Sequence, residues 1–136
     1  MGRVEGKICL VTGAANGIGK ATAQRLASEG GTVVATDIDK KVQKTVDDIV
    51  SEGGQAVYLE QDVTKEKHWE MVIEQCCSRF GGLDVLINNA GILLMKPLQE
   101  TSLEEWNKIF RVNVTSIFLG TKFALVRCAL EMAGLL

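Results

Sequence analysis

Short apolar runs alternate with longer amphipathic stretches along the first 90 residues of the chain. The apolar runs cover residues 7–12 (KICLVT), 32–36 (TVVAT), 55–60 (QAVYLE) and 83–88 (LDVLIN). Runs of four to eight residues that are bounded by turn residues are typical of buried strands. The pattern therefore predicts four strands.

The stretches between these runs carry apolar residues at helical spacing. The first predicted helix opens in the glycine-rich turn 13–19 and runs to about Glu29. Asp39 and Thr64 are the predicted N-caps of the next two helices, because their side chains can accept from the first free amides. The apolar stripes on those two helices are Val42, Val46, Ile49 and Val50, and Trp69, Val72, Ile73, Cys76 and Phe80.

Two further helices are predicted in the last third of the chain. Ser102 and Glu105 fit a capping box that begins a short helix, and another helix follows from about Arg111. Trp69 and Trp106 are expected in the core, and His68 is expected at the surface. Strands that alternate with helices over short connections specify a parallel sheet with helices on both faces, a doubly wound α/β fold.

Composition and charge exclude several classes of protein. The 136 residues are 46% hydrophobic and 24% charged with a net charge of −2, which leaves too little polarity for disorder and no basic footprint for nucleic acid or an anionic membrane. Four cysteines without a C-x-x-C pair and a single histidine predict no metal site. No secretory signal is visible, and charges interrupt the apolar stretch 117–136, so a cytoplasmic protein is expected.

The glycine-rich turn is the first candidate binding feature. Residues 13–19 (GAANGIG) lie between a strand and a helix, where backbone amides and the helix dipole stabilise a pyrophosphate. The turn misses both the G-x-G-x-x-G pattern and the P-loop pattern. Taken alone, it fits either phosphate binding or close packing of the helix.

Asp37 favours the phosphate interpretation. It follows the second strand, 18 residues after Gly19, close to the spacing of an acid that binds the ribose diol of NAD. A 2′-phosphate would meet a like charge there, so NAD is preferred to NADP. Asp37 could also be a simple turn residue, and the nearby Lys40 and Lys41 weaken the preference.

Several segments resemble the short-chain dehydrogenase/reductase family. They are Thr12–Gly19, which matches T-G-x-x-x-G-I-G, Asn88–Gly91, which matches N-N-A-G, the pair Asp62–Val63, and Asn113 in Val-Asn-Val. The resemblance implies a Rossmann-like sheet of strand order 3-2-1-4 in a single, incomplete NAD-binding domain, 1–136, truncated after the fourth strand and the following helix. It implies cofactor contacts from Gly13, Asn16, Gly17, Ile18, Gly19, Asp37, Asp62, Val63, Asn89, Ala90 and Gly91.

The same resemblance implies hydride transfer between NAD and an alcohol or ketone. Asn113 matches the asparagine whose backbone helps to hold a proton-relay water and is therefore the catalytic candidate. The family also uses a serine and a Tyr-x-x-x-Lys pair, yet the one tyrosine here is Tyr58, and Asp62 stands four residues later. The chain alone is therefore expected to bind NAD(H) without catalysing the reaction. Segments around Lys96 and Trp106 look most like secondary and alicyclic alcohol dehydrogenases.

An early stop would leave apolar surface uncovered. The fourth strand would become an unprotected sheet edge, and apolar residues surround most of the last helix, so homo-oligomerisation or association with a relative is expected. Those residues are Val114, Ile117, Phe118, Leu119, Phe123, Leu125, Val126, Cys128, Leu130 and Met132. Two alternatives stay open: a non-catalytic interaction partner of a full-length relative, or a truncated or frameshifted product in which 126–136 departs from the family's sequence.

Overall fold

A computed structural model of the chain describes residues 2–132 and places four strands and five α-helices in them. In chain order these are β1 (Ile8–Thr12), α1 (Gly17–Ser28), β2 (Thr32–Asp37), α2 (Val42–Ser51), β3 (Gln55–Glu60), α3 (Glu66–Phe80), β4 (Val85–Ile87), α4 (Leu103–Phe110) and α5 (Ser116–Met132). A short 3-10 turn (Leu98–Glu100) precedes α4, and a π-helical segment (Arg111–Thr115) joins α4 to α5.

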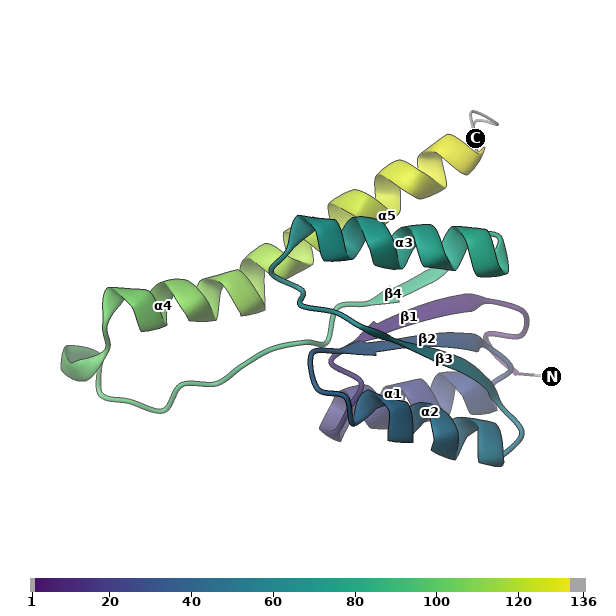
Figure 1. The fold of residues 1–136 in the computed structure, drawn as a ribbon, viewed down its shortest axis with the longest axis horizontal. Coiled ribbons are helices and arrows are strands. Elements are labelled where there is room, and N and C mark those ends of the chain that lie inside the picture. Colours follow the sequence, from purple (N-terminus) through teal and green to yellow (C-terminus); the bar gives the residue numbers. More distant parts are fainter. Residues whose placement is uncertain (1, 133–136) are drawn as a thin grey trace.

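The strands form one parallel sheet in the order β3-β2-β1-β4. Helices α1 and α2 cover one face, and α3 and α5 cover the other (Figure 1). This arrangement confirms the predicted doubly wound fold and its strand order. Because all four strands run the same way, their carboxyl ends and the loops that follow meet at one edge of the sheet.

Side chains that alternate along each strand divide the core into two clusters. On β1, Val11 points into the cluster beneath α1 and α2, whereas Leu10 points into the cluster beneath α3 and α5. Trp69 anchors the second cluster, where it is fully buried and donates from Nε1 to the Val63 carbonyl at 2.9 Å. Both faces of the sheet are therefore packed, as a parallel sheet requires.

Two predicted N-caps were wrong. Asp39 Oδ1 accepts from the amide of Lys41, and Lys41 is the N-cap of α2. The Thr64 hydroxyl donates to Asp62 instead of capping α3, which begins after Lys65. In both loops the short polar side chain closes a local turn before the helix begins, which is a common competing use of these residues.

Strand β4 is shorter than predicted, because the residues on either side of it make hydrogen bonds that involve side chains instead of ladder bonds between backbones. At its start, Asp84 Oδ2 accepts from the amide of Ile8 at 2.8 Å. At its end, the amide of Asn89 reaches the Thr12 hydroxyl at 3.1 Å. Only Val85–Ile87 stay in the ladder with β1, and within the described residues this strand is an edge of the sheet, as expected.

The two predicted C-terminal helices form one helical run, because the π-helical segment connects them without a break. The capping box at Ser102 and Glu105 is present. Helix α4 extends away from the sheet (Figure 1), so Trp106 is 49% exposed and stacks on Phe110 at 4.7 Å between ring centroids. The predicted place of Trp106 in the core was wrong. On α2, Val50 of the predicted apolar stripe is 53% exposed.

The run Leu103–Arg127 is long and apolar enough to cross a membrane, with a mean hydropathy of 1.4 over its most apolar window. Core helices of soluble proteins pass the same test, so length and composition alone are weak evidence for a membrane span. The side chains of Cys128, Leu130 and Met132 and the predicted departure toward residue 136 lie outside the described part of the structure.

Candidate functional site

A cleft of about 700 Å³ opens at the carboxyl ends of the strands. Ten of the twelve predicted site residues line it, and Gly19 and Asn113 do not. The lining residues are Gly13, Asn16, Gly17, Ile18, Asp37, Ile38, Gln61, Asp62, Val63, Thr64, Asn89, Ala90, Gly91, Ile92, Lys108, Arg111 and Val112. The fold thus gathers loops from β1, β2, β3 and β4 and one wall from the α4–α5 run.

The glycine-rich turn presents the start of α1 to this cleft. Gly17 has a φ of +56°, and a Cβ added to it would meet nothing within 4 Å, so this part of the turn is open toward the cleft. A Cβ on Gly19 would instead overlap the Gly13 carbonyl and the Asn89 amide. Gly19 therefore permits close packing of α1, and the side chain of Asn16, the N-cap, makes no capping bond. The first amides of α1 thus have no side-chain cap, which suits an anion.

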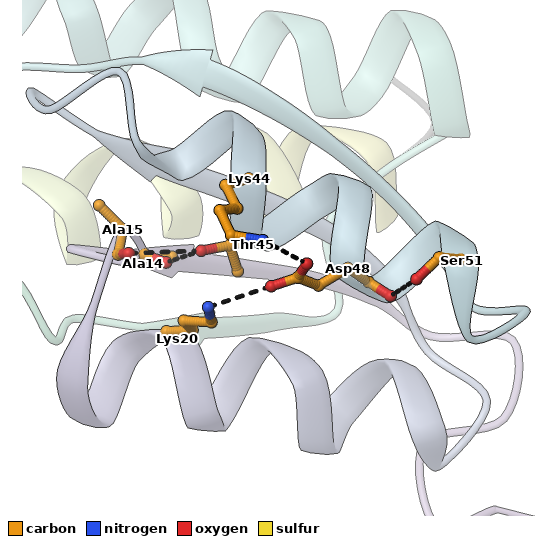
Figure 2. Close-up of polar contacts among 7 residues, drawn as sticks. All are labelled: Ala14, Ala15, Lys20, Lys44, Thr45, Asp48 and Ser51. Carbon is orange, nitrogen blue, oxygen red and sulfur yellow. Dashed lines mark hydrogen bonds and ion pairs between the residues drawn. The ribbon is translucent and has the colours of Figure 1, made fainter.

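Helix α2 holds the same turn from behind (Figure 2). The buried Thr45 hydroxyl donates to the Ala14 carbonyl at 2.8 Å. Asp48 accepts from Lys44 at 3.0 Å and from Lys20 of α1 at 3.1 Å. Hydrogen bonds from Lys44 and then Lys20 lower the pKa of Asp48 below its usual value. These contacts position the turn without entering the cleft.

Asp37 ends β2 with its carboxylate fixed by two backbone amides. Oδ2 accepts from Ala15 at 3.0 Å, and Oδ1 accepts from Asp39 at 2.9 Å. A carboxylate offers about four acceptor positions, so each oxygen keeps capacity for one more donor. The carboxylate therefore both ties the glycine-rich turn to β2 and can accept from a vicinal diol.

Asp62 is held in the loop after β3. Its Oδ1 accepts from the hydroxyl of Thr64 at 2.6 Å and from the Thr64 amide at 3.0 Å. Burial raises the pKa of Asp62, but these two bonds, together with electrostatic contributions from Lys65 and His68, leave that pKa below its ordinary value. The Asp62 amide donates to Nδ1 of His68 at 2.9 Å. His68 is therefore half-buried and hydrogen-bonded, and its predicted position at the surface was wrong.

Thr12 and Asn89 join the ends of β1 and β4. The Thr12 hydroxyl accepts from the amides of Asn89 and Ala90, both at 3.1 Å. In return, Asn89 Nδ2 donates to the carbonyls of Thr12 at 3.0 Å and Gly13 at 3.1 Å. The sequence analysis placed Thr12 in the turn motif and did not predict this role. A threonine at the end of a buried apolar strand was the one sequence feature that indicated it.

Gln61 was also missed, and no sequence signal marked it. The side chain is buried at the end of β3, where Oε1 accepts from the Thr36 hydroxyl at 2.7 Å. Its Nε2 has no hydrogen-bond partner among the described residues. The amide lies in the wall of the cleft between Asp37 and Asp62.

Asn113 lies behind the cleft in the π-helical segment. Its Nδ2 donates to the Ile92 carbonyl, and its Oδ1 accepts from the Ile92 amide, both at 2.8 Å. The side chain is therefore used to clamp the loop after β4 against the helix. A π-helical turn shifts the local backbone pairing and is frequent at functional sites. The proposed backbone role of Asn113 stays a prediction.

Lys108 and Arg111 are the cationic side chains of the cleft, and sequence reasoning did not select them. They balance the formal charges of Asp37 and Asp62 along the lining. Across residues 2–132, no group of three or more His, Cys, Asp or Glu side chains is arranged to hold a metal ion. The arrangement offers free helix amides, an oriented carboxylate and a long cleft, which together suit an extended anionic ligand with a sugar diol.

Comparison with known proteins gives one consistent result. The model of the family described as short chain dehydrogenase matches residues 7–133. Cyclopentanol dehydrogenase of Comamonas testosteroni is 46% identical over 123 residues, which are 90% of this chain and 49% of that protein. The 2,5-dichloro-2,5-cyclohexadiene-1,4-diol dehydrogenase LinX of Sphingobium indicum is 43% identical, with coverages of 90% and 50%.

Comparison with solved structures gives the same family as the sequence comparison. A short chain dehydrogenase from Mycobacterium avium superposes with a TM-score of 0.93 at 36% identity, covering 98% of this chain and 50% of that one. Another, from Mycobacterium smegmatis, gives 0.89 at 36% identity, with coverages of 93% and 54%. The chain spans about half the length of the curated relatives and solved structures that it matches.

Proposed function

Since the chain belongs to the short-chain dehydrogenase family, we propose that it forms the NAD(H)-binding part of an alcohol or ketone oxidoreductase. The observation that carries this proposal is the fixed carboxylate of Asp37, which lies in one cleft with the glycine-rich turn. A turn alone fits phosphate or packing, whereas a turn and an oriented acid together fit a dinucleotide.

The residues of the cleft fit NAD in order along the sheet. The amides of α1 beyond Gly17 would hold the diphosphate, and Asp37 would accept from the adenosine ribose. Asp62 and Val63 would contact the adenine, and Asn89–Gly91 would line the path toward the nicotinamide. When bound, the nicotinamide supplies a hydride donor or acceptor. The chain's own part is to bind and orient the dinucleotide.

NAD is the preferred cofactor in this proposal. A 2′-phosphate would approach the Asp37 carboxylate, whose two oxygens already accept from backbone amides and stay oriented toward the cleft. Like charges in contact cost several kcal/mol, whereas hydroxyl donors are favoured. Lys40 and Lys41 are exposed beyond this carboxylate, and neither lines the cleft.

Hydride transfer needs proton-exchanging groups that these 136 residues do not supply in the expected pattern. Tyr58 lies on β3 and is 43% exposed, and it does not line the cleft. We therefore expect no sustained turnover by this chain alone. For a protein that combines this part with a serine and a Tyr-x-x-x-Lys pair, the relatives favour a secondary, alicyclic alcohol as substrate.

Calorimetric titration of the purified chain with NADH and NADPH tests the proposal. We expect NADH to bind at least about tenfold more tightly, and Asp37→Ser to narrow that ratio. Asp37→Asn is the matched variant, since it keeps one oxygen for the turn while it removes the charge. Equal affinities of the unmutated chain for both cofactors would refute the ribose argument. Sustained oxidation of cyclopentanol with NAD would refute the expected inactivity.

An exposed apolar face favours a second candidate function, association with another protein chain. We define the apolar face as the exposed large apolar side chains of the helical run, namely Leu103, Trp106, Phe110, Val114, Ile117, Phe118, Leu125 and Val126. Contiguous apolar surface of this kind is typical of an interface. A second copy of the chain or a full-length relative is the proposed partner.

A further inference from the structure

Two cationic side chains of the cleft have no carboxylate partner. Lys108 and Arg111 are exposed, and among the described residues no Asp or Glu oxygen lies within 4.0 Å of either one. Five other lysines do pair with carboxylates: Lys7 with Asp84, Lys20 and Lys44 with Asp48, Lys65 with Asp62, and Lys96 with Glu105. The two cations that line the cleft are thus available to a ligand.

Sheet topology indicates which part of a dinucleotide they would meet. If the diphosphate lies at the end of β1 and Asp37 accepts from the ribose at the end of β2, the base extends to the next strand, β3. Asp62 and Val63 follow β3 and line the cleft there. The adenine ring would therefore lie against Val63, at the end of the cleft away from β4.

The wall with Lys108 and Arg111 lines the same cleft as Val63. Val112 belongs to the apolar cluster that contains Val63, and the next residue, Asn113, bonds to Ile92 in the loop after β4. The start of the π-helical segment is therefore connected to both the Val63 part of the cleft and the loop after β4. Lys108 lies one helical turn before Val112, and Arg111 directly precedes Val112 in the chain. All three residues line the cleft. The two cations thus flank Val112 in the helical run that joins α4 to α5, and α5 covers the same face of the sheet as α3 (Figure 1).

We infer that Arg111 and Lys108 form a cationic wall over the adenine ring of the bound dinucleotide, a role that rests on the proposed function. A guanidinium is planar, weakly hydrated and stacks on aromatic faces, and a cation over such a face is stabilised by the ring. Val63 supplies an apolar surface for the other side of the ring. Arg111 thus acts as a determinant of affinity for the adenosine half, in addition to Asp37.

Binding of three nucleotides to four variants of the full chain tests this inference. The nucleotides are NADH, ADP-ribose, which lacks nicotinamide, and reduced nicotinamide mononucleotide, which lacks adenosine. The variants are Arg111→Gln, Arg111→Lys, Lys108→Gln and the control Lys67→Gln, an exposed cation of α3 that does not line the cleft. Circular dichroism of each variant verifies that the fold is unchanged.

For Arg111→Gln we expect the Kd of NADH and of ADP-ribose to rise by about two- to fivefold, the size of an exposed cation–aromatic contact. Arg111→Lys should recover part of this loss, because the charge returns without the planar group. The mononucleotide and the control Lys67→Gln should show no change.

Three outcomes would overturn the inference. Unchanged NADH affinity in Arg111→Gln and Lys108→Gln, in a chain that does bind NADH, would remove the cationic wall and leave the proposed function intact. An equal loss for the mononucleotide would show that the cations act on phosphate instead of adenine. Failure of the unmutated chain to bind NADH or ADP-ribose would refute the proposed function and this inference with it.

Discussion

A single hydroxyl, that of Thr12, connects two strands at the floor of the cleft. It is buried and accepts from the amides of Asn89 and Ala90. Sequence comparison with the family marks this threonine only as the start of a turn motif. Its bonds show that it also positions the loop on which Asn89, Ala90 and Gly91 reach the cleft.

Thr12→Val should therefore destabilise the chain although it conserves shape. The substitution leaves the half-buried amide of Ala90 without an acceptor, at a cost of about 1 to 3 kcal/mol, while the amide of Asn89 keeps its bond to the Ile87 carbonyl at 3.0 Å. Urea unfolding followed by circular dichroism measures the loss. Thr32→Val, which removes a more exposed bond to Gln55 in the same sheet, is the control and should change stability by less. Equal losses would contradict the role given to Thr12.

Asp62 should make stability depend on pH in the acid range. Its pKa in the folded chain lies below the ordinary value of 3.8, because the bonds from Thr64 and the electrostatic contributions of Lys65 and His68 together exceed the effect of burial. Ionised Asp62 therefore contributes stability above pH 3.8, and this contribution is lost as the pH falls through the lower, folded value. Urea midpoints between pH 5 and pH 2 should fall less steeply for Asp62→Asn than for the unmutated chain. An equally steep fall for Asp62→Asn would contradict this role of Asp62.

At the scale of elements, the packing of α5 on α3 depends on one small residue. A Cβ on Gly120 would lie 2.6 Å from Trp69 Cη2 and 2.6 Å from Asn88 Oδ1. Trp69 cannot move aside easily, since it is fully buried and bonded to Val63. The glycine thus sets how closely α5 approaches both α3 and the end of β4.

Gly120→Ala should lower the free energy of unfolding by about 1 to 3 kcal/mol, because overpacking outweighs the higher helix propensity of alanine. Chemical denaturation gives the value, and Thr121→Ala on the exposed side of the same helix is the control. A Gly120→Ala variant as stable as Thr121→Ala would show that α5 can shift without cost.

The helical run from α4 to α5 shows what periodicity can and cannot predict. The capping box at Ser102 and the helical nature of both segments followed from local sequence and were correct. The π-helical join at Arg111–Thr115 was not predicted, because a single π-helical turn is set by contacts made in the folded protein and has no sequence signature of its own. Its position is tied to Asn113, whose side chain bonds to Ile92, 21 residues away in the chain.

At the scale of the whole molecule, the α5 end of the apolar face lies beside β4, the edge strand of the sheet within the described residues. A smaller cavity of about 300 Å³ lies between them and is lined by residues of β4 and α5, among them Leu86 and Ala124. Exposed strand edges and apolar helix faces both favour pairing with another chain. The larger cleft of the candidate site opens elsewhere, at the carboxyl ends of the strands.

We therefore expect the purified chain to associate as its concentration rises, and we expect Phe118→Glu with Leu125→Glu to reduce that association. A charge in the middle of an apolar interface is costly to bury. Sedimentation velocity measures the distribution of species. Val50→Glu places the same charge on an isolated exposed apolar residue of α2 and should have no effect. A monodisperse, cooperatively unfolding monomer of the unmutated chain would contradict this prediction.

Local pattern was sufficient for most of the elements, whereas the family resemblance supplied the strand order and most of the residues that line the cleft. Continuous apolar runs predict strands that are buried on both faces of a sheet. A glycine-rich turn predicts a tight backbone at a helix start, and an acid after the next strand predicts a carboxylate near that turn. The misplaced N-caps at Asp39 and Thr64 arose because a short polar side chain serves a turn and a helix start equally well.

By itself the sequence determined a doubly wound fold and the chemical groups at its switch point, because both depend on neighbours a few residues apart. Only the tertiary structure decided that Thr12 holds Asn89, that Asn113 clamps Ile92, and that Lys108 and Arg111 face the same cleft as Asp62. These relations join residues 20 to 80 positions apart, and their energies depend on distances that no local pattern encodes.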